Sequence, residues 1–149
     1  MKKSTLTVLL AGALLLGLKA NAAGVGYIDY QKVQENFPFA QQAVKEVDSK
    51  ALEMQQFMVD KEKQYKSLDT PLKKQNFEEQ TAREFKLKED AYMRLKAQKE
   101  EQVYNKIQAA AKQVLVDQRL DAIVDYRVIF VGGVDISDLV IQKLKSSQY

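Results

Sequence analysis

The residue types that most often carry enzyme chemistry are scarce in this chain of 149 residues. It has no His, Cys or Trp, which removes imidazole catalysis, thiolate nucleophiles and zinc sites built on those ligands. Helix capping and strand-edge solubility explain the acids near the C-terminus more simply than a cation site or an acid–base pair does. These acids are Asp117, Asp121, Asp125, Asp135 and Asp138. We therefore predict no catalytic set, no metal site and no cofactor.

A cluster of lysines is the next candidate, because basic residues exceed acidic ones by three between positions 61 and 74. Such a patch could contact anionic lipid head groups or acidic partners. The alternative is an ordinary solvated helix end. The predicted basic patch comprises Lys61, Lys63, Lys66, Lys73 and Lys74.

Large apolar residues in the middle of the chain exceed what one buried helix face requires. Exposed apolar side chains tend to bind something, and Met adds soft, adaptable contact surface. We predict that one set contacts a partner without fixed shape: Leu52, Met54, Phe57, Met58, Val59, Leu87 and Met93. The alternative for each residue is packing between helices or against a neighbouring subunit.

These residues belong to two predicted long helices. The first should begin at Pro38 and end near Ser67, since apolar residues recur at steps of four and three. This heptad seam comprises Ala40, Val44, Val47, Ala51, Met54, Met58, Lys61, Tyr65 and Leu68. Thr70 can cap the second helix, with Pro71 in its first turn and its end near Asp117. Two long helices joined by a tight turn predict an antiparallel hairpin.

The second helix has a less regular apolar line. Lys88 and Lys99 stand where an apolar residue would be expected. The line itself comprises Leu72, Phe77, Thr81, Phe85, Tyr92, Leu95, Val103, Ile107, Ala110 and Val114. We therefore expect a partly hydrated pair of helices that bends.

The segments on either side of the hairpin predict a small β-rich body. Residues 25–30, 120–125 and 128–131 are rich in strand-forming side chains, and the last two should form a hairpin through 126–127. Gly132-Gly133 should be a turn, because no Lys follows at phosphate-loop spacing. Asp135 should cap a final helix whose inward residues are Leu139, Val140 and Leu144. The predicted fold is α+β and mostly α, with a body too thin to be stable without oligomerisation.

The N-terminus predicts export. Lys2 and Lys3 precede an apolar run from Leu6 to Leu18, and Ala20-Asn21-Ala22 offers small residues for cleavage after Ala22 or, alternatively, Ala23. Cleavage would remove three lysines and leave 20 basic and 20 acidic residues, which argues against nucleic-acid binding. We expect a signal peptide at 1–22 and one domain at 23–149, with a body (23–37 and 118–149) and an arm (38–117).

The whole predicted mature chain resembles the Skp/OmpH family of periplasmic outer-membrane-protein chaperones. The leading GYIDYQKVQENFP, the charged hairpin and the closing LDAIVDYRVIFVGGVDISDLVIQKLK carry the resemblance. It implies a homotrimer whose arms enclose a cavity and hold unfolded outer-membrane β-barrel proteins without ATP. The body and trimer-contact residues would then be Val25, Tyr27, Ile28, Ala122, Val124, Ile129 and Val131.

Two functions remain after an enzyme is set aside. The first is a holding chaperone of the periplasm, which would bind unfolded clients and keep them from aggregating. The second is a structural or adaptor coiled coil of the cell envelope. Surplus apolar residues and the irregular second helix favour the chaperone.

Overall fold

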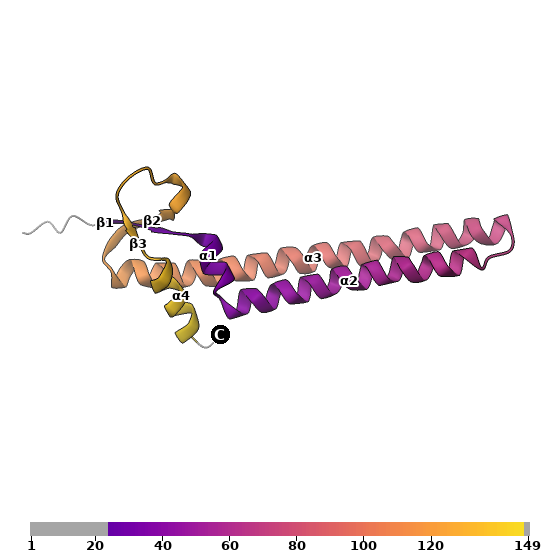
Figure 1. Cartoon of the computed structure of the whole chain (residues 1–149), viewed down its shortest axis with the longest axis horizontal. Coiled ribbons are helices and arrows are strands. Elements are labelled where there is room, and N and C mark those ends of the chain that lie inside the picture. Colours follow the sequence, from indigo (N-terminus) through magenta and orange to yellow (C-terminus); the bar gives the residue numbers. More distant parts are fainter. Residues whose placement is uncertain (1–23, 148–149) are drawn as a thin grey trace, which may run out of the picture.

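The computed structural model describes residues 24–147, so the predicted signal peptide lies outside the described residues. The chain is mostly helical, with a long arm and a small body at one end of it (Figure 1). The elements in chain order are β1 (Gly24–Ile28), α1 (Tyr30–Glu35), α2 (Pro38–Lys66), α3 (Pro71–Asp117), β2 (Leu120–Asp125), the 3₁₀ turn η1 (Tyr126–Val128), β3 (Val134–Asp135) and α4 (Ser137–Ser146).

The arm consists of α2, which leaves the body, and α3, which returns to it. Both helices begin with the proline that the sequence predicted, because proline lacks the N–H that the first turn leaves unpaired. Thr70 caps α3 as predicted, since its Oγ1 accepts a hydrogen bond from the Lys73 N–H at 3.3 Å. The predicted limits of both helices are therefore confirmed.

The predicted seam of α2 is wrong at three of its nine positions and right at the other six. Ala43, Lys50 and Phe57 face α3 more closely, whereas Val44, Ala51 and Met58 are exposed. The two frames differ by one residue and share Val47, Met54 and Lys61, so apolar spacing alone could not separate them. The apolar line predicted for α3 is correct except at Leu72, which is exposed.

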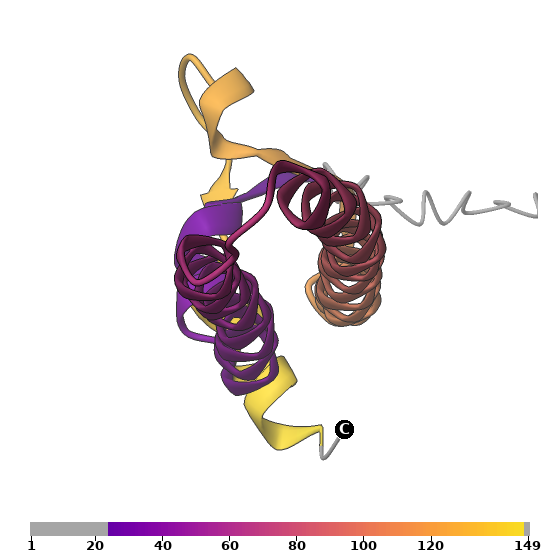
Figure 2. The ribbon, with the colours of Figure 1, turned by 90° about the vertical axis from the view of Figure 1, so that its right-hand side faces the viewer.

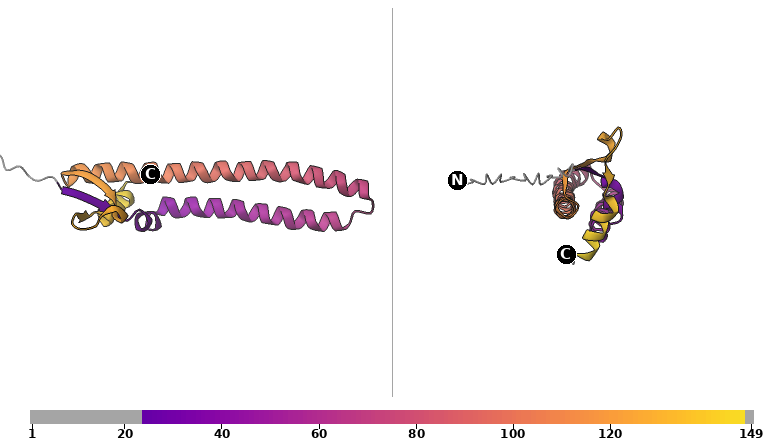
Figure 3. Two further views of the ribbon diagram at one scale, coloured as in Figure 1. Left: turned by 90° about the horizontal axis from the view of Figure 1, so that it is seen from above. Right: turned by 90° about the vertical axis from the view of Figure 1, so that its left-hand side faces the viewer.

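The three strands form a parallel sheet in the order β2-β1-β3. The view from above in Figure 3 shows the sheet at the body end of α3. The predicted strand at 128–131 and its hairpin with 120–125 are wrong, because the chain makes a 3₁₀ turn there and the third strand lies at Val134–Asp135. The turn between them uses Gly132 and Gly133, whose φ angles of 83° and 86° favour glycine.

One hydrophobic core joins the body to the base of the arm. It contains Val33, Phe37, Ala40, Ala43, Val103, Ile107, Ala110, Ala111, Val114, Ile136, Val140, Ile141 and Leu144. The prediction for α4 is right for Val140 and Leu144 but wrong for Leu139, which is exposed while Ile141 is buried. The four helices and their cap residues therefore supply this core, and Ile28 of β1 and Leu120 and Ile123 of β2 pack against it.

The segment 126–134 stands clear of both arm helices, as the view along the arm in Figure 2 shows. It carries large apolar side chains that the described chain leaves uncovered, namely those of Tyr126, Val128, Phe130, Val131 and Val134. An apolar projection of this kind is typical of a surface that a partner covers.

Candidate functional site

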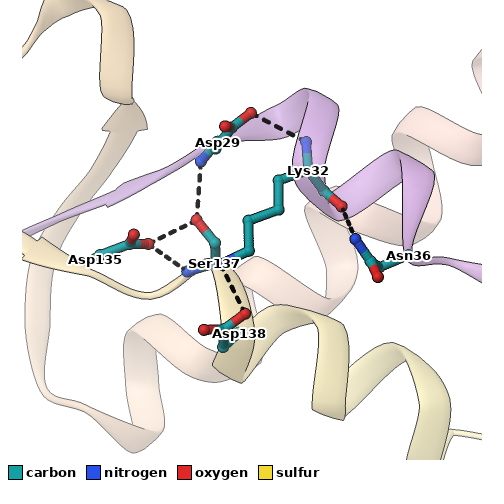
Figure 4. Close-up of polar contacts among 6 residues, drawn as sticks. All are labelled: Asp29, Lys32, Asn36, Asp135, Ser137 and Asp138. Atoms are coloured by element: carbon teal, nitrogen blue, oxygen red, sulfur yellow. Dashed lines mark hydrogen bonds and ion pairs between the residues drawn. The ribbon is translucent and has the colours of Figure 1, made fainter.

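Ser137 ties the two ends of the body together and is fully buried. Its Oγ accepts a hydrogen bond from the Asp29 N–H at 2.9 Å and donates one to Asp135 Oδ1 at 2.6 Å (Figure 4). The same Asp135 oxygen accepts from the Ser137 N–H at 2.9 Å. Asp135 was predicted to cap α4, but the cap residue is Ile136, and Asp135 bonds the first N–H of the helix from one position earlier. These hydrogen bonds fix the start of α4 against the junction of β1 and α1.

Charged groups extend this clamp. Asp29 caps α1 through the Lys32 N–H at 3.0 Å, and the Lys32 ammonium lies 2.8 Å from Asp138. Hydrogen bonds from the Ser137 hydroxyl and N–H hold the pKa of the Asp135 carboxyl below its usual value. The carboxylate therefore stays ionised and keeps accepting both bonds at neutral pH.

Most of the acids that could have formed a cation site have other partners. Asp117 pairs with Lys143 at 2.9 Å, and Asp125 pairs with Arg127 at 2.7 Å. The part of the chain from 24 to 147 contains no group of three or more His, Cys, Asp or Glu that could hold a metal ion. The arrangement is that of capping and surface pairing.

The outer arm has lysines where an apolar seam was expected. Lys61 lies between the helices with its side chain only 16% exposed, and its ammonium contacts Glu84 at 2.6 Å. It also lies over the rings of Phe57 and Phe77, at 5.1 and 5.2 Å from their centroids. Lys88 of α3 lies 5.1 Å from the Phe57 centroid as well. Cation–π contacts and one ion pair therefore join the helices here.

A second polar layer lies nearer the body, where Lys99 of α3 meets Glu46 of α2 at 2.5 Å. Hydrogen bonds from Lys99 and Gln42 lower the pKa of Glu46, and those from Lys61 and Gln80 lower the pKa of Glu84. Since Glu46 faces Lys99 and Glu84 faces Lys61, the two pairs fix the register of α2 against α3.

The structure divides the predicted partner-binding residues into two groups. Met54 and Phe57 are half-buried between the helices and belong to the seam. The others are exposed, with Leu52 at 64%, Leu87 at 70% and Met93 at 56%, and Met58 and Val59 less so. The outer arm therefore keeps a set of apolar side chains that its own helix pairing does not cover.

Most lysines of the predicted basic patch have an acidic partner. Lys63, Lys66 and Lys73 pair with Asp60, Glu62 and Asp69. Lys74 lies 5.2 Å from the centroid of the Tyr65 ring, and Lys61 is in the seam. The excess of three basic residues between 61 and 74 remains, and acids on either side of it bring residues 60–84 to six basic and six acidic residues. Contact with an anionic lipid surface stays a prediction.

Most of the predicted body and trimer-contact residues lie in or beside the sheet. Tyr27, Ile28, Ala122, Val124 and Ile129 are half-buried. Val25 and Val131 are exposed, so in a single chain these two are surface residues and not core. The role of the set in a trimer stays a prediction.

Sequence reasoning missed Ser137 and the seam lysine pairs. The signal for Ser137 was its place two residues after Asp135, where a hydroxyl and an N–H can bond the same carboxylate. The signal for the seam was the helical spacing of an aromatic residue and a lysine on each helix, Phe57 with Lys61 on α2 and Phe77 with Lys88 on α3. A count of apolar residues does not register such a pattern.

The fold and the exposed apolar side chains of the arm define a class of protein in which a small body carries a projecting helical arm with uncovered apolar surface. Residues 24–147 contain no metal-binding cluster. Among residues 24–147, none of the helices combines the length and the apolar character of a membrane span. The family model "Outer membrane protein (OmpH-like)" matches residues 24–144. The chain belongs to this OmpH-like family, as its sequence resemblance predicted.

A search of curated proteins finds no match to the chain. Among solved structures, the chain is similar to a candidate OmpH-like outer membrane chaperone from Caulobacter crescentus CB15. The identity is 16%, the match covers 82% of this chain and 83% of that one, and the TM-score is 0.38.

Proposed function

We propose that this protein is a periplasmic chaperone that holds unfolded outer-membrane β-barrel proteins, without ATP, until they are inserted. Membership of the OmpH-like family supports the link to outer-membrane proteins. The observation that carries the proposal is the exposed apolar set on the arm: Leu52, Met58, Val59, Leu87 and Met93. Moving side chains of this size out of water and against an apolar partner lowers the free energy.

Weak contacts spread along an arm suit a client that has no fixed shape. Each one contributes little, but several on one molecule raise the effective concentration of the next contact. The client's own folding or insertion can then release it, because the chaperone competes only for the unfolded form.

Several arms acting together would strengthen this hold. We propose that the body forms the homotrimer that the family resemblance implies. Support comes from the uncovered apolar side chains of segment 126–134, which need a partner surface. A trimer would place three copies of the exposed arm set around one client.

Suppression of aggregation tests the proposal. A urea-denatured β-barrel protein is diluted into buffer with the mature protein, and light scattering is followed. We expect suppression at one trimer per client. It should be lost when four exposed arm residues become serine: Leu52, Val59, Leu87 and Met93.

A matched variant controls for the number of changes. It replaces four exposed arm glutamines by serine: Gln55, Gln56, Gln75 and Gln98. This variant should suppress aggregation as the unchanged protein does. Equal suppression of aggregation by both variants would mean that the exposed apolar residues of the arm do not hold the client.

Cross-linking in the envelope separates the chaperone from an adaptor coiled coil. A chaperone should cross-link to many unrelated β-barrel proteins through its arm. One constant partner at fixed stoichiometry would support the adaptor instead.

A further inference from the structure

The seam of α2 shifts by one residue partway along the arm. Ala43, Lys50 and Phe57 follow one another at steps of seven residues and face α3. The next residue of this first series would be Gln64, but Gln64 is exposed, and Tyr65 contacts α3 in its place. The change of frame therefore lies between Phe57 and Tyr65.

Contacts at both ends make a change of frame necessary. Ala43 is 4% exposed and belongs to the core that joins the body to the arm. At the tip, the Tyr65 ring lies 6.4 Å from the Phe77 ring, and the Lys74 ammonium lies 5.2 Å from the Tyr65 centroid. The seam must therefore shift by one residue somewhere between Ala43 and Tyr65.

The position of the shift is not determined in the same way. A second series of apolar residues begins one position after Ala43 and reaches Tyr65 at the same steps of seven. It comprises Val44, Ala51, Met58 and Tyr65. The residues between, Val47, Met54 and Lys61, belong to the seam in either series. A shift nearer the body would therefore exchange Lys50 and Phe57 for Ala51 and Met58 and keep the rest.

Each series has one favourable and one unfavourable feature. The first places the Phe57 ring under Lys61 and Lys88, whose ammonium groups each lie 5.1 Å from its centroid. It also places the charged Lys50 in the seam, with its side chain only 34% exposed, and leaves Met58 45% exposed. The second series would cover Met58 and return Lys50 to solvent, at the loss of the contacts to the ring.

α3 favours a different winding from α2. Its half-buried and buried residues recur every eleven positions, in the sets Thr81, Tyr92, Val103, Val114 and Phe77, Lys88, Lys99, Ala110. A seven-residue repeat winds a helix pair to the left, whereas an eleven-residue repeat winds it slightly to the right. The two helices of the arm therefore do not specify one common supercoil.

A small change in this winding is enough to exchange the two series. Because the shared residues lie between Phe57 and Met58 around the helix, a turn of about 50° replaces one by the other. A straight helix drifts by about 20° per seven residues relative to a seven-residue seam, which is about 40° from Ala43 to Phe57. The drift has the direction that brings Met58 toward α3. A straighter α2 anchored at Ala43 therefore approaches the second series.

We propose that the change of frame moves along α2, so that the outer arm has two states. In the first state, which is that of the structure, Lys50 and Phe57 face α3 and Met58 is presented at the surface. In the second state Ala51 and Met58 face α3 and Phe57 is presented.

The movement itself needs no client, but its use rests on the proposed function and deepens it. The arm offers a flexible thioether side chain in the first state and an aromatic ring in the second. A client segment that binds the ring of Phe57 favours the second state, because it has this contact in that state only.

Thiol reactivity tests the movement, because the chain has no Cys and an introduced thiol has no competitor. The reporter is Met58→Cys, and its rate of alkylation by a maleimide measures the exposure of position 58. Ala51→Leu adds apolar surface to the second series and should slow this alkylation about fivefold. Ser49→Leu adds the same side chain at an exposed position outside both series and should leave the rate unchanged. Equal rates in the two variants overturn the movement.

A second reporter, Phe57→Cys, separates the movement from a general tightening of the arm. Ala51→Leu should raise its alkylation rate about threefold, because the second state turns position 57 outward. Lys50→Leu strengthens the first series and should lower that rate without slowing alkylation of Met58→Cys. If Ala51→Leu changes the rates of both reporters in the same direction, the movement is contradicted.

Photo-cross-linking tests the use of the second state. The photoreactive ring of p-benzoylphenylalanine replaces that of Phe57, and an unfolded β-barrel protein is added. The client should cross-link to this position, and Lys50→Leu should reduce the yield about threefold because it holds the ring in the seam. Ser49→Leu should leave the yield unchanged. A yield that Lys50→Leu does not reduce contradicts the use of the second state.

The movement and the proposed function can fail separately. If the two reporters do not respond while aggregation is still suppressed, the movement is lost and the function stays. If the reporters respond as predicted but aggregation is not suppressed, the movement stays and the function is lost.

Discussion

The two ends of the arm differ in what joins their helices. At the base, small and branched side chains such as Ala40, Ala110 and Val114 are fully buried. Farther out, no residue of α2 beyond Ala43 and none of α3 before Val103 is buried. There the helices meet through ion pairs and through lysines over aromatic rings.

This difference separates stability from binding along one pair of helices. The base buries apolar surface and carries most of the hydrophobic stabilisation, which grows with the area removed from water. The outer arm buries less and keeps apolar side chains for another molecule. A chaperone needs both, because a fully closed arm would have nothing left to offer a client.

The largest effect should come from a cavity at the base. Ile107→Ala removes a side chain that is 2% exposed and should lower the free energy of unfolding by about 2–5 kcal/mol. Leu95→Ala on the half-buried outer seam should cost less than half of that. Urea unfolding followed by circular dichroism measures both. Equal costs would mean that the outer seam is packed like the base.

The next effect concerns the clamp in the body. Ser137→Ala leaves the Asp29 N–H without its acceptor and should cost about 1–3 kcal/mol. Ser146→Ala is the control, because its hydroxyl bonds a carbonyl on the exposed end of α4 and should cost under about 0.5 kcal/mol. The same urea titration separates them, and a cost of Ser137→Ala no larger than that of Ser146→Ala would rule the clamp out.

A smaller effect should appear in the outer arm alone. Lys61→Met removes a partly buried ion pair between the helices and should speed amide exchange in the outer arm while leaving the body unchanged. Lys63→Met removes an exposed pair with 3.8 Å between its charged atoms and should change exchange less, because exposed pairs contribute little to stability. Equal changes in the two variants would contradict the seam role of the Lys61–Glu84 pair.

The smallest effect should be one of pH. The pKa values of Glu46 and Glu84 are lowered from 4.5 by Lys99 and Lys61, so both pairs stabilise the arm fully above pH 4.5. That stabilisation is lost as the pH falls through the lowered values. Carboxyl chemical shifts should titrate below 4.5 for both groups. Titration at or above 4.5 would mean that the pairs are not formed.

The sequence predicted the arm better than its seam. Pro38, Thr70 and Pro71 mark helix ends by local chemistry, which depends on the nearest residues only. The seam of α2 depends on which residue of α3 lies opposite. Phe57 faces α3, because Lys61 and Lys88 contact its ring. Neither apolar spacing nor hydropathy contains that information.

The body shows the same limit in its strands. The run Val128–Val131 has high strand propensity, but Asp125 caps a turn through the Arg127 N–H and ends β2 before it. β3 instead pairs with β1 through Gly26 and Tyr27, which lie more than a hundred residues earlier. Propensity names strand-forming residues, whereas pairing over such a distance selects which of them form a strand.

Hydrogen exchange of the protein with and without an unfolded β-barrel client tests whether the outer arm holds the client. We predict that the client slows exchange in the outer arm, over residues 52–59 and 87–93, and leaves the base of the arm unchanged. Slowed exchange confined to segment 126–134 of the body, with the outer arm unaffected, would contradict it.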